Sequence, residues 1–380
     1  MSRKSGFFGN LISYSVLLVN LLAILWLALC YVSGITRPGT FRYLELLNLT
    51  APFAIAVNAV FVAVWLLTPR KWRALCSMLT LLVFHELVFS VFGIHYFSKN
   101  DMEPRPGFLK VMTWNVHGLG IYDLPEDKKV PGRMLEFIRA ENPDILCMPE
   151  FYTEWDDAMK PHSDRFLKQG NFKEYRFIYD NSLGTKIYIG TAFYSKYPLH
   201  NLKEIQLAEY IKMMQCDVEL PGRKMMRTYF IHLQSFQLMD KDKKLIEELK
   251  KRDKKIPIEA SRSYADRFNT AYLKRAEQAE RAREIIDRSP YPVLICGDLN
   301  DLPGSYTYNT VKGKLLDAFS RKGRGLGRTY NAIMPTLRID HIFYDPVLLR
   351  ITGFRSPHTS LSDHNPVIAN FEIADSAPIQ

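Results

Sequence analysis

The chain has 380 residues, of which 47% are hydrophobic, with 50 Lys/Arg against 40 Asp/Glu and a formal net charge of +10. This length exceeds what one small core needs, which favours two units of unequal size. Residues 1–110 hold ten Lys/Arg and four Asp/Glu, so most of the excess charge lies there and the rest of the chain is only weakly basic. A weakly basic region does not by itself indicate a nucleic-acid-binding surface.

Three apolar stretches open the chain, at about residues 12–32, 49–67 and 75–92. Each approaches the roughly 20 residues that a helix needs to cross a bilayer. The first stretch is too long for a removable signal peptide and lacks a small-residue cleavage site. We therefore expect an anchor of three transmembrane helices within residues 1–100, followed by a linker at 101–107.

The placement of Lys and Arg predicts the orientation of this anchor. Arg3 and Lys4 precede the first stretch, and Arg70, Lys71 and Arg73 lie in the link between the second and third. The loop between the first and second stretches holds only Arg37 and Arg42. Because basic loops stay in the cytoplasm, we expect a bacterial inner-membrane protein whose large domain lies outside the cytoplasm. His85 and Glu86 fall within the third stretch, and we interpret them as interhelical hydrogen-bonding groups rather than functional ones.

Residues 108–374 alternate strands and helices, which predicts an α/β domain, and residues 375–380 form a tail. A strand at 108–116, a helix at 133–141 and a strand at 144–148 make one strand–helix–strand unit. Extended segments at 175–179, 187–194, 205–219 and 226–233 are typical of one antiparallel meander. The segment 238–289 is charge-rich and helical in pattern, and strands resume at 292–296, 338–344 and 366–373.

Polar side chains gather where the apolar strands end: Asn115, Glu150, His232, Asp298, Asn300, Asp340, Asp363 and His364. Taken singly, each has an ordinary structural explanation as a turn residue, a helix-start charge or a buried hydrogen-bonding group. Strand ends on one edge of a sheet converge on a shared crevice. Carboxylates and histidines collected there would repel one another or lack partners unless a cation or a phosphate lay between them.

Oxygen ligands predominate in this set, and the five cysteines, at 30, 76, 147, 216 and 296, have no metal-binding spacing. We interpret the cysteines as buried thiols. The hard ligands indicate Mg²⁺ or Mn²⁺ rather than structural zinc. Such a metal can polarise a phosphoryl oxygen, while a carboxylate orients water and amides or histidines stabilise negative charge.

The motifs Thr-Trp-Asn115, Pro-Glu150, Ile-His232-Leu, Gly-Asp298-Leu-Asn300-Asp, Arg-Ile-Asp340-His and Ser-Asp363-His364-Asn-Pro occur in this order. The ordered set resembles the endonuclease/exonuclease/phosphatase superfamily, and the similarity covers about residues 108–374. The resemblance implies a four-layer sandwich of two packed mixed β-sheets flanked by helices, like that of deoxyribonuclease I, here preceded by three transmembrane helices.

The same resemblance implies a role for each residue. Glu150 would bind the metal, with Asn115 and Asp363 as further ligands or neighbours of the ligand. Asp298 would orient or deprotonate the attacking water, and Asp340 would orient His364. His364 and His232 would stabilise the transition state, and the substrate would contact Asn115, Asn300 and His232.

Three features depart from the family pattern. Pro149 precedes Glu150 where Gln is usual, and His341 follows Asp340 where an aromatic residue is common. The charged segment 238–289 is long for a connection between these motifs, and we interpret it as a substrate-facing flap.

These observations predict a divalent-metal-dependent phosphoester hydrolase. A nuclease is the first interpretation, because nucleases are widespread in the superfamily, although a fold does not determine a substrate. A sphingomyelinase-like phospholipid phosphodiesterase or a phosphatase is the alternative, since an anchor would hold the site near lipid headgroups. An inactive membrane-tethered binding scaffold is the third. The expected partners are a phosphoester substrate, either nucleic acid or a phospholipid headgroup, and the bilayer; the sequence indicates no protein partner.

Overall fold

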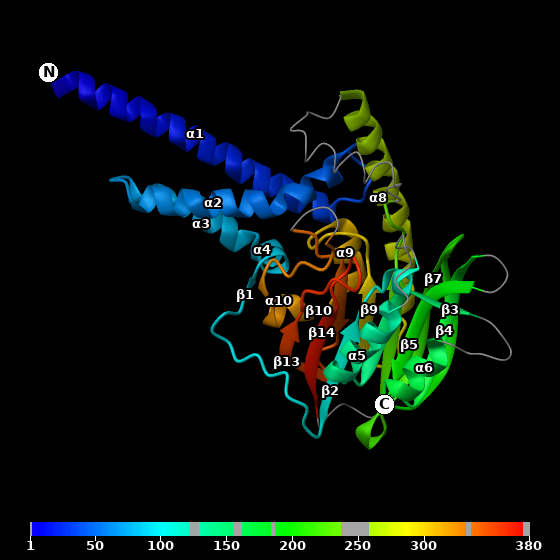
Figure 1. Cartoon of the computed structure of the whole chain (residues 1–380). Coiled ribbons are helices and arrows are strands. Elements are labelled where there is room, and N and C mark those ends of the chain that lie inside the picture. Colours follow the sequence, from blue (N-terminus) through cyan, green and yellow to red (C-terminus); the bar gives the residue numbers. More distant parts are fainter. Residues whose placement is uncertain are drawn as a thin grey trace.

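The computed structural model describes residues 2–121, 129–154, 162–183, 187–236, 258–331 and 336–374. The tail at 375–380 lies outside these residues, as do positions 238–257 of the charged segment. An elongated helical bundle projects from a mixed α/β body (Figure 1).

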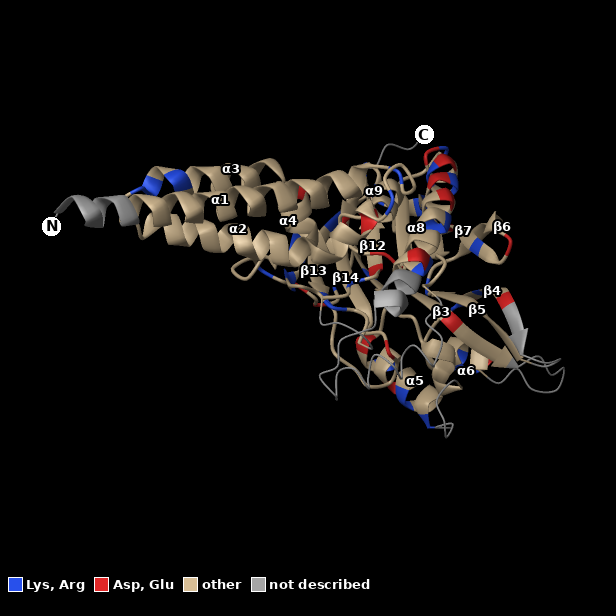
Figure 2. Ribbon diagram, turned by 90° about the horizontal axis from the view of Figure 1, so that it is seen from above, with Lys and Arg blue, Asp and Glu red and all other residues tan. Residues whose placement is uncertain are grey.

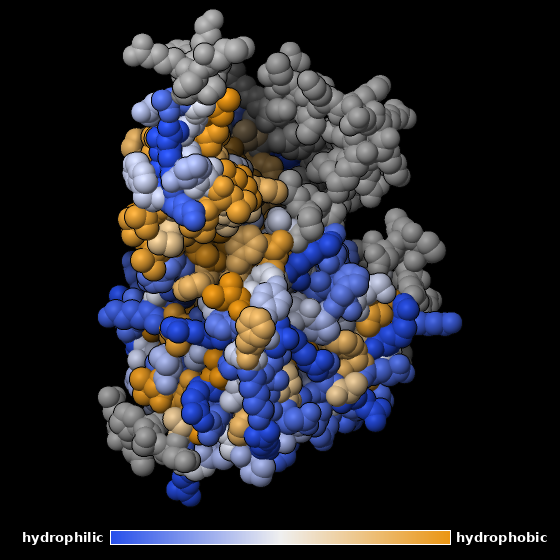
Figure 3. Space-filling view, turned by 90° about the vertical axis from the view of Figure 1, so that its left-hand side faces the viewer, coloured by the Kyte–Doolittle hydropathy of each residue, from blue (hydrophilic) through white to orange (hydrophobic). Residues whose placement is uncertain are grey.

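Two N-terminal helices are long and apolar enough to cross a membrane. The first is part of α1 (Ser2–Ile35) and spans Gly9–Ile35, and the second joins the 3-10 helix η1 (Leu44–Thr50) to α2 (Ala51–Leu66). The bundle carries almost no charged residues along its length, and Lys and Arg gather at its end remote from the body (Figure 2). Seen from the remote end of the bundle, hydrophobic residues surround a group of hydrophilic ones, and hydrophilic residues predominate on the body (Figure 3).

The third apolar stretch is bent. The short 3-10 helix η2 (Lys71–Arg73) leads into α3 (Ala74–Val83), which meets α4 (His85–Val91) at an angle of 72°. The structure therefore contains two candidate spans, or three if the bent pair is counted as one. Nδ1 of His85, the first residue of α4, lies 3.0 Å from the carbonyl of Leu82 on α3, so this contact is made across the bend.

A buried polar network joins the three apolar segments of the bundle. Asn20 on α1 donates to Ser77 on α3 (2.6 Å), Ser77 donates to Asn58 on α2 (3.1 Å), and Trp65 on α2 donates back to Asn20 (2.8 Å). Because apolar surroundings supply no competing water, such mutually satisfied side chains align neighbouring helices.

Two six-stranded sheets form the body. The first has the order β13-β14-β2-β3-β5-β4 and the second β10-β12-β9-β8-β7-β6. Within each, one pair is parallel, β2 with β3 and β8 with β9, and the other pairs are antiparallel. The strands of the first sheet are β2 (Phe108–Thr113), β3 (Ile145–Glu154), β4 (Glu174–Leu183), β5 (Ile187–Ser195), β13 (Leu349–Arg355) and β14 (Val367–Ile373). Those of the second are β6 (Leu199–Ala208), β7 (Ile211–Leu220), β8 (Lys224–His232), β9 (Val293–Asp298), β10 (Leu316–Asp317) and β12 (Asp340–Tyr344).

Helices cover the outer face of each sheet, which confirms the predicted four-layer α/β sandwich. Helices α5 (Val130–Glu141) and α6 (His162–Gln169) pack on the first sheet, and α8 (Ile258–Ile286) and α9 (Tyr306–Lys312) pack on the second. Between the sheets lies a third apolar layer that includes Val111, Phe193 and Phe230. The smaller elements are η3 (His117–Gly120), η4 (Pro221–Arg223), α10 (Ala318–Lys322) and the short pair β1 (Gly93–Ile94) and β11 (Arg324–Gly325).

The predicted single meander was wrong in two respects. Strands β4 and β5 belong to the first sheet and β6 to β8 to the second, so the chain changes sheets at residues 196–198. The segment predicted as one strand at 205–219 is instead a hairpin that turns at residues 209–210. The turn residues, Glu209 and Tyr210, include neither glycine nor proline, so the sequence carried no turn signal there. The cysteines are free thiols, as predicted, and all but Cys76 are buried.

The bundle packs directly against the body. Asn309 donates to the Gly34 carbonyl at the end of α1 (2.9 Å), and Asn48 donates to the Pro303 carbonyl (3.3 Å). A Cβ atom on Gly34 would lie 1.9 Å from the carbonyl oxygen of Gly304, so the two backbones meet without room for a side chain. The segment predicted as a linker also has partners, since the Asp101 amide donates to Thr352 of β13 (2.9 Å). The proposed division at 101–107 stays a prediction.

Replacing Phe230 by alanine is expected to destabilise the protein. The rings of Phe193 and Phe230 lie 4.2 Å apart and join the two sheets, and both are fully buried. The cavity left by Phe230→Ala should cost about 3–5 kcal/mol, which corresponds to a fall of roughly 6–20 °C in melting temperature. Leu202→Ala removes a half-exposed side chain and serves as the control. Equal melting temperatures for the two variants would contradict the assigned packing.

Candidate active site

The site lies where the parallel strands of both sheets end. Parallel pairing places His232, the last residue of β8, opposite Asp298, the last residue of β9. Asp298 is also opposite Asp340, the first residue of antiparallel β12. In the first sheet, the Val116 amide donates to the Pro149 carbonyl (3.1 Å), which brings the segments that carry Asn115 and Glu150 together.

Glu150 occupies an irregular position within β3. The register of β3 against β5 shifts between Met148 and Phe151, and Glu150 has a φ of 53°, a left-handed conformation that is costly for a residue with a side chain. Because of this bulge, Pro149 pairs with no residue of β5. Proline lacks a backbone N–H, and at this position that absence breaks no hydrogen bond between the two strands. Pro149, the departure noted in the sequence, therefore fits the backbone that presents Glu150.

Asn115 connects the two sheets at this edge. Its side-chain nitrogen donates to Glu150 (2.9 Å) and to Asp298 (3.2 Å), while its oxygen accepts a bond from the His117 amide (3.1 Å). The last bond determines which end of the amide faces the carboxylates. Asn115 therefore acts here as a donor that holds two acidic groups in position.

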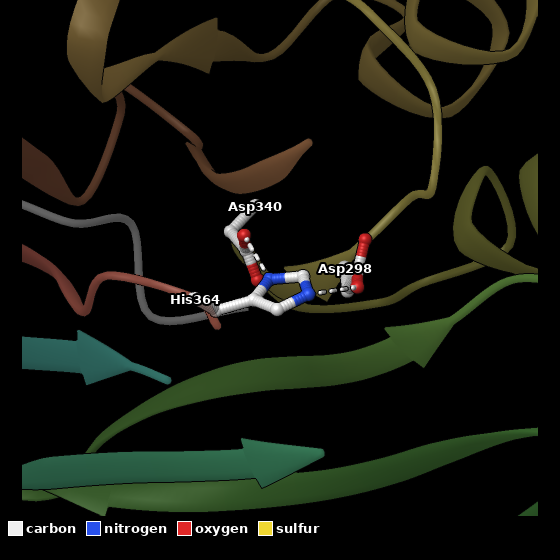
Figure 4. Close-up of side chains that lie close together, drawn as sticks. All are labelled: Asp298, Asp340 and His364. Carbon is white, nitrogen blue, oxygen red and sulfur yellow. Dashed lines mark hydrogen bonds and ion pairs between the residues drawn. The ribbon is translucent and has the colours of Figure 1, made fainter. Parts of the chain in front are cut away.

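His364 lies between two aspartates (Figure 4). Its Nδ1 is 2.8 Å from Asp340 and its Nε2 is 3.8 Å from Asp298. Burial lowers the pKa of His364, but attraction and hydrogen bonding to Asp340, together with Asp298, raise it to about 10. Burial and repulsion from Asp340 raise the pKa of Asp298 to about 6, against the effect of His364. At neutral pH the site therefore pairs a protonated imidazole with a deprotonated carboxylate.

A second group of acidic and imidazole side chains is more open to solvent. Nδ1 of His117 lies 3.4 Å from Asp363 and 3.7 Å from Glu150, and Nε2 of His232 lies 3.7 Å from Glu150. Burial raises the pKa of Glu150, but the bond from His117, the charge of His232 and the bond from Asn115 lower it to about 2. Positive charge thus favours the ionised carboxylate at this position.

Two sets of residues have the donor chemistry of a hard cation. Ligand atoms of Asp298, Asp340 and His364 all lie within 4.8 Å of one another. In that set, however, His364 uses Nδ1 to bond Asp340, which is the arrangement of an oriented acid–base pair. Glu150 and Asp363 are partly exposed, with 27% and 23% of their side chains accessible, and their oxygen atoms lie 3.7 and 3.4 Å from Nδ1 of His117. Their chemistry fits Mg²⁺ or Mn²⁺.

All eight residues predicted from the strand ends lie in this region. Asn300 has a φ of 50°; its amide donates to Asp298 (2.7 Å) and its side chain to the Leu233 carbonyl (2.9 Å). It therefore orients Asp298 and joins the loops that follow β8 and β9.

The sequence did not identify His117 or Asp180. His117 lies in a glycine-rich turn, and the left-handed backbone there (φ 45°) directs it back toward Glu150 and Asp363. Asp180 is a half-buried carboxylate on β4; burial raises its pKa to about 6, and the nearby His232 opposes this. Asp180 directly follows the apolar run at residues 177–179 within β4, and this position was the available signal.

His341 takes no part in the cluster. It is buried against Arg338 (3.0 Å), and its ring stacks on Phe343. Burial and the charge of Arg338 lower its pKa to about 3, so it is a neutral structural group.

Helix α8 forms the described part of the charged segment. Its buried Arg275 pairs with Asp301 (3.4 Å) and donates to the Gln234 carbonyl (3.2 Å). These contacts hold together the loops after β8 and β9. The predicted flap covered residues 238–289. Residues 258–286 instead form α8, which packs on the second sheet, and residues 238–257 lie outside the described part of the chain.

Comparison with known proteins gives two family matches. The family described as endonuclease/exonuclease/phosphatase matches residues 112–364, and a domain of unknown function matches residues 13–91. No curated protein matches the chain.

Solved structures share the fold at low sequence identity. An endonuclease/exonuclease/phosphatase from Beutenbergia cavernae has a TM-score of 0.51 and 19% identity over 72% of this chain and 73% of that one. The human Nocturnin catalytic domain, solved with a bound sulfate anion, has a TM-score of 0.50 and 16% identity over 72% of this chain and 97% of that one. Both are similar to the body of the structure.

Replacing Asp340 by asparagine should lower the pKa of His364. Asp340 raises the pKa of His364, whereas burial lowers it. Once the charge of Asp340 is removed, burial favours the uncharged imidazole ring. In the wild type, the stability gained from this pair is fully present below about pH 6.5 and is lost as the pH rises through about 10. NMR titration of labelled histidines would follow the change in His364.

The control is Asp345→Asn, which removes the same charge from the turn after β12. Titration of His364 near pH 10 in both variants would disprove the role of Asp340.

Proposed function

The chain belongs to the endonuclease/exonuclease/phosphatase family, and from this we propose that it hydrolyses phosphoesters in a divalent-metal-dependent reaction, with nucleic acid as the first candidate substrate. The observation that supports the reaction most directly is the Asn115 side chain, which bonds both Glu150 and Asp298 and so joins an open carboxylate to a buried one beside His364.

We assign metal binding to Glu150 and Asp363. Both carboxylates are partly exposed and lie on either side of His117. A bound Mg²⁺ or Mn²⁺ would supply Lewis-acid polarisation of a phosphoryl oxygen and charge for the leaving oxygen. Asn115 positions Glu150 rather than binding the metal, because its oxygen accepts the His117 amide and its nitrogen faces the carboxylates.

Asp298 is the proposed base. Deprotonated above about pH 6, it can accept a proton from a water molecule, and the Asn300 amide holds its carboxylate in one orientation. His364, kept protonated by Asp340, can donate a hydrogen bond to the negative charge that develops on the phosphoryl group. His232, half-buried beside Glu150, would provide a second donor and contact the substrate together with Asn300.

The choice of nucleic acid rests on the prevalence of nucleases in this family. A phospholipid headgroup is the second candidate, and one observation favours it: Asn48 of the bundle bonds Pro303, three residues beyond Asn300. The site therefore lies close to the end of the apolar helices. We further propose that the body lies outside the cytoplasm, since Arg70 and Arg73 bond Asn10 and Ser13 near the start of α1, and Lys and Arg gather at this end of the bundle, remote from the body (Figure 2).

Replacing Glu150 by glutamine should weaken metal binding. The substitution removes a negative charge while keeping the shape of the side chain, so the affinity for Mn²⁺ should fall at least about tenfold. Calorimetric titration of the full-length protein with Mn²⁺ measures this directly. Glu284→Gln changes an exposed residue of α8 and should bind as the wild type does; unchanged affinity in both variants would refute the assignment of Glu150.

Replacing Asp298 by asparagine should reduce kcat/KM by about 10²–10⁴-fold, the usual contribution of a general base. The phosphoester that the wild type hydrolyses best would be used for this measurement. A wild-type rate in Asp298→Asn, with the protein still folded, would rule out the role as base.

A substrate comparison would separate the three functions. Plasmid DNA, RNA, choline phospholipid and sugar phosphates would be offered to the full-length protein with Mg²⁺ and again with EDTA. Turnover of nucleic acid that EDTA abolishes is the expected result. Turnover of phospholipid alone would favour the second candidate. If no substrate were turned over, the hydrolase proposal would be rejected in favour of an inactive binding scaffold.

A further inference from the structure

We propose that the junction between the helical bundle and the body contains a binding site for an anionic glycerophospholipid, separate from the catalytic cluster. A cavity of about 820 Å³ lies there, between the inner ends of α1 and α4 on one side and α9, β10 and α10 on the other. None of the eight residues predicted for catalysis lines it. This volume lies within the range of pockets that hold small molecules.

Unpaired positive charge borders this cavity. Lys314 and Arg321 are exposed and form no ion pair among the described residues, and Lys312 donates to the Gly313 carbonyl (3.3 Å). One acidic residue of the wall, Asp317, is already neutralised by Arg338 (3.1 Å) and bonded by Tyr308 (2.8 Å). Apart from Asp317, the acidic residue of the wall is Glu86, so the three cations outnumber it. This excess of positive charge can bind a phosphate group.

The opposite wall, formed by α1, α4 and the residues after α4, carries exposed apolar side chains beside polar ones. Ile35, Phe89 and Ile94 line the cavity and are 59%, 40% and 53% exposed. A free phosphate ion would leave these side chains in water, whereas the acyl chain of a lipid would cover them. The combination of cations and exposed apolar side chains therefore favours an amphiphile.

The position of the cavity along the candidate spans supports the same ligand. Ile35 ends the first apolar helix, and α4 is the part of the bent stretch nearest the body. The ends of spanning helices lie at the level of lipid headgroups, where clustered Lys and Arg attract anionic lipids. The site would thus take the lipid directly from the surrounding bilayer.

Native mass spectrometry of the full-length protein in detergent would test the site. Phosphatidylglycerol would be titrated in EDTA, so that no metal-dependent turnover consumes the lipid and failure of the proposed function does not affect the result. One tightly held lipid per chain is expected. In the triple variant Lys312→Gln, Lys314→Gln, Arg321→Gln, the affinity should fall at least about tenfold.

The matched control is Lys173→Gln, Lys203→Gln, Arg288→Gln, which removes the same charge from exposed positions outside the cavity. It should retain wild-type affinity. Phosphatidylcholine and inorganic phosphate are tested in parallel, and Arg321→Gln alone is used if the triple variant fails to fold. Equal affinity of both triple variants, equal binding of phosphatidylcholine, or displacement of the lipid by inorganic phosphate would each overturn the proposal.

Discussion

The balance of charge at the shared edge of the two sheets is the constraint on which this structure depends. Asp298 and Asp340 are buried within one sheet, and Glu150 approaches them from the other. Carboxylates this close repel one another unless cations or hydrogen-bond donors lie between them. Asn115 and His364 supply these donors, and both come from segments next to strands of the first sheet. The packing of the two sheets and the charge balance of the site therefore depend on each other.

This linkage explains why three residues at the edge tolerate an unfavourable backbone conformation. Glu150, His117 and Asn300 all have positive φ, although none is glycine. Regular strands or helices would direct these side chains elsewhere. The cost of each conformation is offset by the hydrogen bonds and ion pairs that the cluster forms once both sheets are in place.

The sequence predicted the layers of the body and the members of the cluster because both depend on simple patterns. Apolar strands ending in polar residues identified Asn115, Glu150, Asp298 and His364 without knowledge of the strand order. Features set by backbone conformation were missed, among them the return of His117 toward Glu150. The bend before His85 was missed for a related reason: composition reveals an apolar stretch, whereas its direction depends on what it packs against.

The backbone contact between Gly34 and Gly304 limits how this protein can change. Where domains are joined by a loose tether, evolution can exchange either one while leaving the other intact. Here the helical bundle and the loop after Asn300 fit together too closely for that, so the two must diversify as a pair. Relatives with other N-terminal regions would be expected to have a differently shaped loop at this point.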